Sequence, residues 1–261
     1  MECVHVGKLE VSRFILSHDP FSGVSHQGPE IDLAMMRYYT SQRIKDTLRE
    51  AEKLGIDTVI GRTDHHVQRI LLEYWDEGGT IKWFAQTTQV DGPQEMLVNR
   101  AIEGKASACH IDARVMDSLL AQGRIHEILP AVDMIREAGM MVGIAGHNPQ
   151  VFIWAERNID VDYYVCSYYN PAPRYDTEEG DEYAVEEIFR EEDRRVMTGL
   201  IQSLTRPAIH YNVLAGGYND PSEAFRFAAS CMRPSDAVCE GVYTKIVAEE
   251  LGENVRLMEE S

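Results

Sequence analysis

The chain has 261 residues, a length at which a single α/β barrel domain is common. Its 43 acidic residues outnumber its 25 Lys and Arg residues, which gives a net charge of −18. This charge argues against sequence-independent nucleic-acid binding and against docking on an anionic membrane, because both depend on basic side chains. We expect the partner to be a small molecule held in a pocket.

The five cysteines are scattered and form no C-x-x-C pair. This usage is typical of a reducing compartment and not of a disulfide scaffold or a zinc ribbon. The N-terminal residues show no targeting pattern, and no stretch approaches the ~18 apolar residues that span a bilayer. The sequence therefore predicts a cytoplasmic protein without a membrane segment. It leaves the oligomeric state open, a homo-oligomer included.

Short apolar runs alternate with amphipathic stretches along the whole chain. The apolar runs predict strands at residues 14–18, 58–62, 81–87, 106–110, 140–145, 163–167, 208–214 and 237–242. The stretches between them predict helices at residues 41–54, 65–77, 95–103, 125–138, 150–158, 182–204, 222–231 and 248–259. Eight such units in ~250 residues indicate the fold class α/β, as a single (β/α)8 TIM barrel domain over residues 1–261. An open, doubly wound sheet is the rival arrangement.

Two long connections follow the first and the sixth predicted strands, at residues 19–40 and 170–181. Loops of this length inside a compact domain are usually functional or disordered. In a barrel both would lie over the C-terminal face, where active sites form. For the second connection, an acidic surface loop without a catalytic role is an equal alternative.

Polar side chains gather where the predicted strands end. In chain order they are His18, Asp19, Asp64, His65, His110, Asp112, His147, Tyr168, Asn170, His210, Asn212 and Glu240. A barrel brings all of its strand ends into one ring, so these groups would converge. Histidine with carboxylates supports general acid–base chemistry or a divalent metal site, and the spacing does not decide between them.

We assign His110 as the central acid, base or ligand, with Asp64 and His65 as its charged partners and His147 as its neighbour from the next strand. The other members of the ring are predicted to bind substrate: His18, Asp19, Asp112, Tyr168, Asn170, His210, Asn212 and Glu240. For any single histidine, a hydrogen-bonded structural side chain is the alternative.

Several segments resemble the aldo/keto reductase family, in family order. Residues 7–13, Gly-Lys-Leu-Glu-Val-Ser-Arg, resemble the N-terminal hairpin that plugs the bottom of that barrel. Residues 142–149, Val-Gly-Ile-Ala-Gly-His-Asn-Pro, are similar to the fifth-strand motif, and residues 168–170, Tyr-Tyr-Asn, to the sixth. Residues 211–217, Tyr-Asn-Val-Leu-Ala-Gly-Gly, resemble the seventh-strand segment, and residues 252–256, Gly-Glu-Asn-Val-Arg, the last helix. The resemblance implies an aldo/keto-reductase-like barrel.

The catalytic groups of the family match this sequence poorly. Its reductases use Asp, Tyr, Lys and His, with Tyr as proton donor to a carbonyl while NADPH delivers hydride. His110 matches the His and Asp64 corresponds to the Asp, whereas the Tyr is absent and Gln86 stands near the position of the Lys. After the eighth strand, only Lys245 and Arg256 could meet a 2′-phosphate.

Three hypotheses follow. The leading one is a non-standard enzyme of isomerase, lyase or hydrolase type, which acts on a small polar, sugar-derived or carbonyl substrate through His and carboxylate chemistry, with or without a divalent metal. The first alternative is an NADPH-dependent aldo/keto reductase with a displaced proton donor, His65 or Tyr168. NADP is disfavoured because an acidic exterior repels phosphates. The second alternative is a non-catalytic, ligand-binding barrel.

Overall fold

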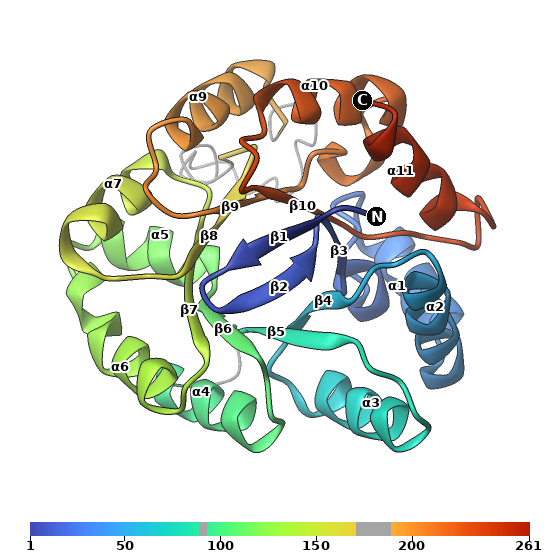
Figure 1. Cartoon of the computed structure of the whole chain (residues 1–261), viewed down its shortest axis with the longest axis horizontal. Helices are drawn as coiled ribbons and strands as arrows, with labels where there is room; N and C mark the ends of the chain where they lie inside the picture. Colours follow the sequence, from blue (N-terminus) through green and yellow to red (C-terminus); the bar gives the residue numbers. More distant parts are fainter. Residues whose placement is uncertain (89–92, 171–188) are drawn as a thin grey trace.

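The computed structural model describes residues 1–88, 93–170 and 189–261. Its centre is a closed barrel of eight parallel strands in the order β10-β3-β4-β5-β6-β7-β8-β9, with helices outside (Figure 1). The barrel strands are β3 (Phe14–Ser17), β4 (Thr58–Arg62), β5 (Lys82–Gln86), β6 (Ala108–Ile111), β7 (Met141–Gly146), β8 (Tyr163–Ser167), β9 (Ala208–Tyr211) and β10 (Ala237–Glu240). The predicted (β/α)8 TIM barrel is confirmed, and the open-sheet rival is excluded.

The helices outside the barrel follow the predicted alternation. They are α1 (Pro29–Tyr38), α2 (Ser41–Lys53), α3 (His65–Asp76), α4 (Gln94–Glu103), α5 (Ala113–Ala121), α6 (Leu129–Glu137), α7 (Pro149–Asn158), α9 (Glu191–Ile201), α10 (Pro221–Cys231) and α11 (Glu250–Glu259). None of these described helices is long and apolar enough to cross a bilayer.

The long connection after β3 is not the loop that the sequence indicated. It contains the short 3-10 helix η1 (Asp19–Ser22) and α1, which begins at a proline in its first turn. The other long connection, at residues 170–181, lies almost entirely outside the described residues, as does the start of the helix expected at 182–204. Between β6 and α6 the chain forms a further helix, α5, and a short 3-10 helix, η2 (Ile125–Ile128).

Polar side chains after the strands begin the helices that follow. Asp64 accepts a hydrogen bond from the backbone N–H of Val67, at 2.9 Å, and so caps α3. Asp112 caps α5 through the N–H of Arg114 at the same distance. Asn148 caps α7 in the same way. Such caps satisfy backbone donors that the first turn of a helix leaves free.

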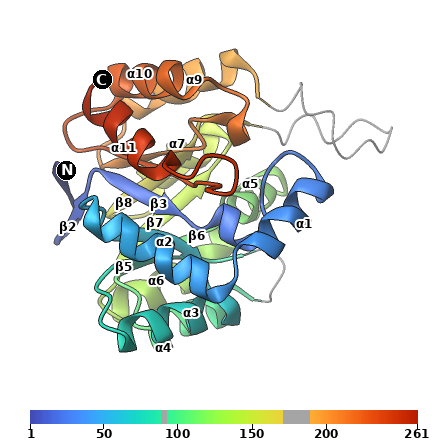
Figure 2. The same cartoon turned by 90° about the vertical axis from the view of Figure 1, so that its right-hand side faces the viewer.

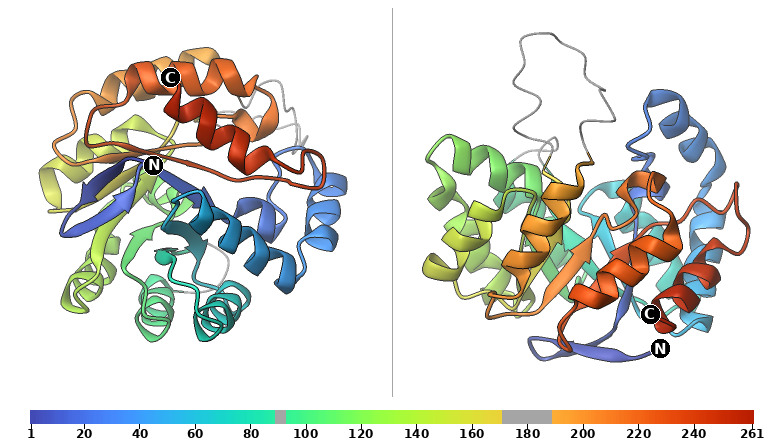
Figure 3. Two further views of the ribbon diagram at one scale, coloured as in Figure 1. Left: turned by 45° about the vertical axis from the view of Figure 1, so that its right-hand side comes forward. Right: turned by 90° about the horizontal axis from the view of Figure 1, so that it is seen from above.

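A hairpin of β1 (Cys3–Val6) and β2 (Leu9–Ser12) lies across one end of the barrel (Figure 1). Val4, Val6 and Val11 are buried there in one apolar cluster with Met141 and Tyr163 of the barrel. The hairpin therefore closes the N-terminal end of the strands, as the resemblance implied. In side view α1 lies at the opposite end, over the carboxyl ends of the strands (Figure 2), and the view from above agrees (Figure 3).

Candidate functional site

A cavity of about 600 Å³ lies at the carboxyl ends of the barrel strands, and we name it the strand-end cavity. Its polar lining comes from almost every strand of the barrel and from the helices that follow them. These polar residues are His18, Asp19, Ser25, His26, Asp32, Arg62, Gln86, His110, Asp112, Arg114, Asp117, Ser118, His147, Ser167, Tyr169, Tyr211 and Asn212. The position is the one at which TIM barrels carry their active sites.

Two buried histidines line this cavity, and each has a ring nitrogen with no hydrogen-bond partner among the described residues. His110, on β6, is fully buried; its Nδ1 lies 3.0 Å from the hydroxyl of Tyr163, while its Nε2 has no hydrogen-bond partner among the described residues. Neither ring nitrogen of the buried His18 is hydrogen-bonded within that same part of the chain. Buried polar atoms are nearly always paired in folded proteins, so these nitrogens are available to a ligand.

Burial keeps both imidazoles neutral. It lowers the pKa of His110 to about 3, and the neighbouring His18 contributes to the same shift. Burial likewise lowers the pKa of His18, although the carboxylate of Asp19 acts in the opposite direction. The Nε2 of His18 lies 3.8 Å from that carboxylate. At neutral pH the two rings can exchange hydrogen bonds with a substrate but carry no charge.

A histidine held by a carboxylate also lines the cavity. The Nδ1 of His147 lies 2.7 Å from the Oδ2 of Asp117, a largely buried side chain on α5. The backbone N–H of Asn148 also donates to Asp117, at 3.1 Å. A carboxylate that fixes one ring nitrogen orients the imidazole and leaves the other nitrogen for proton transfer. The pair has the geometry of a general base with its orienting group.

Tyr211 is the last residue of β9, and its side chain contacts residues at the end of β3. Its hydroxyl donates to the carboxylate of Asp19 and lies 3.0 Å from the Oγ of Ser17. Burial raises the pKa of Tyr211 well above its ordinary value, and the charge of Asp19 adds to the shift. The phenol therefore stays protonated and acts as a hydrogen-bond donor to Asp19.

Gln86, at the end of β5, stands near the position that the resemblance gives to a lysine. Its Nε2 donates to Asp112 at 2.8 Å. Lys82 begins the same strand and its Nζ lies 2.5 Å from Asp57, at the other end of the barrel. No lysine is among the described residues that line the cavity with His110, so the structure describes no ammonium group there that could lower the pKa of a tyrosine.

The structure does not bring Asp64, His65 or Asn170 into the strand-end cavity. Asp64 caps α3 and lies 3.4 Å from the Nε of Arg62, and His65 is exposed at the start of that helix. Neither belongs to the lining, so the expected partnership of these two residues with His110 is not seen. Asn170 follows β8, and its backbone N–H donates to Asp193, at 3.2 Å. It does not line the cavity either.

Tyr168 and His210 also lie outside the cavity lining. The hydroxyl of Tyr168 lies 2.8 Å from the Nδ1 of His210, and the Nε2 of His210 lies 3.3 Å from Asp236. Burial alone would raise the pKa of Asp236, but hydrogen bonds from His210 and Arg233 bring it below its ordinary value. These groups form a buried hydrogen-bonded network that joins residues of β9 to residues that adjoin β8 and β10, and the role in substrate binding predicted for Tyr168 and His210 stays a prediction.

Six of the predicted site residues line the strand-end cavity, namely His110, His147, His18, Asp19, Asp112 and Asn212, and other lining residues were not predicted. Asp117 was not predicted because it lies inside helix α5 and not at the end of a strand. Arg62 ends β4 and lines the cavity, so the strand-end pattern itself could have found it.

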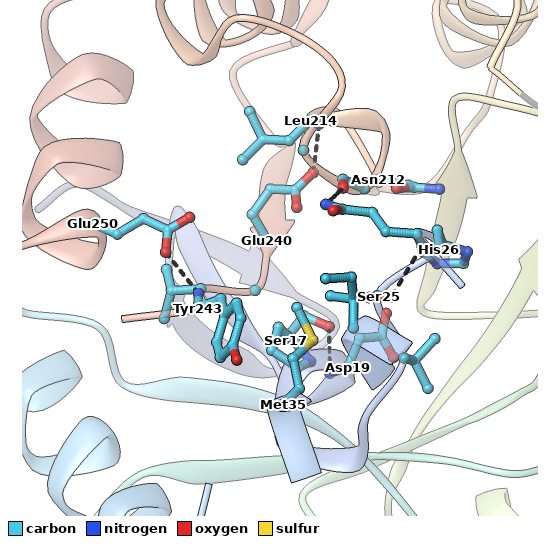
Figure 4. Close-up of a pocket in the computed structure, with 18 of the residues that line it drawn as sticks. Ser17, Asp19, Ser25, His26, Met35, Asn212, Leu214, Glu240, Tyr243 and Glu250 are labelled. Atoms are coloured by element: carbon cyan, nitrogen blue, oxygen red, sulfur yellow. Dashed lines mark hydrogen bonds between the residues drawn. The ribbon is translucent and has the colours of Figure 1, made fainter. Parts of the chain in front are cut away.

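A second, smaller pocket of about 230 Å³ adjoins the cavity, and we name it the Glu240 pocket (Figure 4). Asp19, Tyr211 and Asn212 line both spaces. Glu240, at the end of β10, accepts a hydrogen bond from the backbone N–H of Leu214 at 2.9 Å. Burial raises the pKa of Glu240 to about 8, and the nearby Asp19 adds to the shift. The prediction that Glu240 is a ligand-facing residue therefore concerns this pocket and not the larger cavity.

The Glu240 pocket lies between the segment after β9 and the segment after β10, where the resemblance implies the phosphates of a nicotinamide cofactor. None of the described residues that line it is Lys or Arg, and three carry carboxyl groups. Lys245 is not in the lining, and Arg256 is paired with Glu260 at 2.7 Å. The residues present do not fit the phosphates of a dinucleotide. Nor does the described part of the chain hold a group of three or more His, Cys, Asp or Glu residues able to bind a metal ion.

No protein-family model matches the chain, and no curated protein matches its sequence. Its resemblance to solved structures is one of fold. A Pseudomonas aeruginosa protein described as a candidate aldo-keto reductase is 17% identical, with a TM-score of 0.64, over 99% of this chain and 95% of that one. An aldo-keto reductase from Bacillus halodurans, solved in its holo form, is 10% identical, with a TM-score of 0.62, over 99% and 91%.

An enzyme described by another activity shares the architecture. A truncated 3-deoxy-D-arabino-heptulosonate 7-phosphate synthase from Thermotoga maritima is 12% identical, with a TM-score of 0.57, over 99% of this chain and 91% of that one. The molecule is thus an aldo-keto-reductase-like (β/α)8 barrel. Since one fold serves many chemistries, its activity has to be argued from its own site.

Proposed function

We propose that the protein is an enzyme that transfers protons on a small polar substrate bound in the strand-end cavity. One observation carries the proposal: two buried histidines line the same cavity as the His147 and Asp117 pair, and each has a ring nitrogen without a hydrogen-bond partner among the described residues. An apolar side chain could fill the same space without a buried polar atom. A buried nitrogen that stays unpaired costs free energy, unless a ligand supplies its hydrogen-bond partner. The reaction class is isomerisation, elimination or hydrolysis, by acid–base chemistry.

In this proposal His147 is the general base. Asp117 holds its Nδ1–H, so that Nε2 accepts a proton from a substrate carbon, hydroxyl or water. We assign the tautomer in which Nδ1 of His110 accepts from the hydroxyl of Tyr163, 3.0 Å away, so that the ring proton is on Nε2. That neutral N–H then donates to a carbonyl or hydroxyl oxygen of the substrate and stabilises negative charge that develops there.

The experiment is a screen of small aldoses, ketoses and hydroxy acids for isomerisation, elimination and hydrolysis, with the wild type, His147→Ala and His110→Ala. For any activity found, removal of the general base should lower kcat by roughly 10²–10⁴-fold. His126→Ala, an exposed histidine on η2, is the matched control and should keep full activity. Unchanged turnover in both cavity variants would show that the histidines are structural.

Reduction of a carbonyl with a nicotinamide cofactor is the second candidate. The reductases among the solved structures with the same fold favour it. The two displaced proton donors considered for it, His65 and Tyr168, lie outside the cavity lining, and the Glu240 pocket offers a dinucleotide no cation among its described residues. Fluorescence titration with NADPH and NADH separates the candidates, since micromolar binding would favour reduction. A barrel that binds a ligand without turnover is the outcome if the screen finds no reaction.

A further inference from the structure

Three carboxyl groups surround the Glu240 pocket. Asp19 comes from the segment after β3, Glu240 from β10, and Glu250 from the start of α11 (Figure 4). Glu250 accepts a hydrogen bond from the backbone N–H of Tyr243, at 2.6 Å. No Lys or Arg of the described chain lines the pocket, so no described cationic side chain there would offset negative charge on these groups. Carboxylates that share a site disfavour each other's charged form unless a cation joins them.

A hydroxyl group provides a second, independent sign of a ligand. The side chain of Tyr243 lines the same pocket and is only 9% exposed. Its hydroxyl has no hydrogen-bond partner among the described residues. A buried tyrosine hydroxyl usually finds one, and a ligand N–H would supply it.

The pocket also borders the proposed reaction site. Asp19, Tyr211 and Asn212 line both spaces, so a substrate bound in one would lie next to the other. A volume of about 230 Å³ suits a short aminoalkyl or amino-sugar group. The Glu240 pocket thus offers acceptors for a cation, and the neighbouring strand-end cavity holds the groups proposed to transfer protons.

We propose that the Glu240 pocket binds a protonated amine, carried by a substrate whose polar carbons lie in the strand-end cavity. The substrate class is then an amino sugar or an amino polyol. This inference rests on the proposed function for the part of the substrate in the larger cavity. The amine subsite itself depends only on Asp19, Glu240, Glu250 and Tyr243, so it can be tested by binding without turnover.

The test compares N-methyl-D-glucamine with sorbitol, its uncharged counterpart, by isothermal titration calorimetry on the full chain at pH 8.5 and low salt. At that pH Glu240 is largely ionised, whereas an alkylamine keeps its proton below a pKa of about 10. The titratable groups that line the pocket with Glu240 are Asp19, His26, Tyr211, Cys239, Tyr243 and Glu250. We expect the amine to bind about tenfold more tightly than sorbitol, as one added ion pair in a partly buried site would give.

Glu240→Gln should abolish the preference for the amine over sorbitol, because it removes the carboxylate while the side chain keeps nearly the same shape. Glu249→Gln, which removes an exposed carboxylate one residue before α11, is the matched control and should keep it. If Glu240→Gln does not fold, Tyr243→Phe serves instead and should weaken amine binding severalfold. Equal binding of amine and sorbitol, or a preference that survives both pocket variants, overturns the inference.

The outcomes also separate this inference from the proposed function. Activity on uncharged sugars that depends on His147, with no preference for amines, would leave the proton-transfer enzyme standing and refute the amine subsite. Tight amine binding without turnover in any assay would support the subsite and count against the enzyme.

Discussion

Several ionisable side chains around the two cavities are held in their uncharged forms by burial. His110 and His18 lose their tendency to bind a proton, whereas Glu240 gains one. These shifts have opposite signs because desolvation always disfavours the charged form, which is the protonated form of an imidazole and the ionised form of a carboxyl. Each shift therefore links folding stability to pH in its own direction.

Glu240 should make the folded protein less stable as pH rises. Its pKa is about 8 in the folded chain, against an ordinary value of 4.5, so the folded state holds a proton that the unfolded state releases. The contribution is fully present below pH ~4.5 and is lost as pH rises to about 8, at no more than roughly 1.4 kcal/mol per pH unit. Urea unfolding of wild type and Glu240→Gln at pH 5, 6.5 and 8 measures it, and the wild type should lose free energy of unfolding relative to the variant as pH rises, because Gln does not titrate.

The difference between wild type and Glu240→Gln isolates the contribution of Glu240 to the pH dependence of stability, because both proteins contain the two histidines. His18 and His110 have lowered pKa values, so their contributions are present above the ordinary histidine pKa and are lost as pH falls. Wild type alone would show the sum of these opposed slopes. Curves that stay parallel across the range would show that Glu240 is ionised in the folded state.

Sequence alone could place residues in the ring but could not give their roles. Asp64 and Asp112 follow strands, and in a barrel a residue at that position also begins the next helix. A polar side chain there satisfies the free N–H groups of the first turn whether or not it touches a ligand. The two demands select the same residue types, so only the geometry separates the cap at Asp64 from the cavity wall at Asp112.

At the scale of elements, β7 and β8 together fix the position of His110. A Cβ added to Gly143 on β7 would lie 2.3 Å from the ring of Tyr163 on β8. That ring packs edge-on against His110 and its hydroxyl reaches the Nδ1. The missing side chain of Gly143 therefore provides the space in which the supporting tyrosine sits.

Gly143→Ala should displace Tyr163 and disturb His110. Overpacking of a closed core of this kind costs about 1–3 kcal/mol, and any activity that depends on His110 should fall with it. Gly199→Ala is the matched control, because a Cβ there meets no atom within 4 Å in the middle of α9, and it should be neutral or stabilising by about 0.5–1 kcal/mol. Chemical unfolding and the activity screen check both; equal stabilities of the two variants would contradict the packing argument.

The strands were more predictable than the connections. Residues 58–62 and 163–167 form β4 and β8 as expected, because buried parallel strands read as continuous apolar runs. The run at 208–214 ends early, at Tyr211, because Asn212 takes a φ of 61° and turns the chain away. The segment at 19–40 resembled a loop because of its glycines and prolines, yet α1 starts at Pro29, where proline costs no hydrogen bond.

At the scale of the whole molecule, the two ends of the barrel differ: the hairpin packs against one end, and the cavities lie at the other. Valines of β1 and β2 fill the N-terminal end, while the polar ring and both cavities lie at the other end. Chain order alone indicated this polarity, since every strand of a (β/α)8 barrel runs in the same direction. It could not indicate the Glu240 pocket, which depends on how the segments after β3, β9 and β10 meet.

The net charge of −18 should make stability depend on salt. Like charges repel in the compact state, and the range of that repulsion falls from about 30 Å at 0.01 M salt to about 8 Å at 0.15 M. Exposed ion pairs such as Arg124 with Glu127 and Arg136 with Asp133 weaken in salt as well, but solvent screening leaves each with little effect on stability. The repulsion involves every surplus carboxylate, so it should prevail, and the urea midpoint should rise between 0.01 M and 0.15 M NaCl at constant slope. A midpoint that falls instead would mean that local pairing outweighs the net charge.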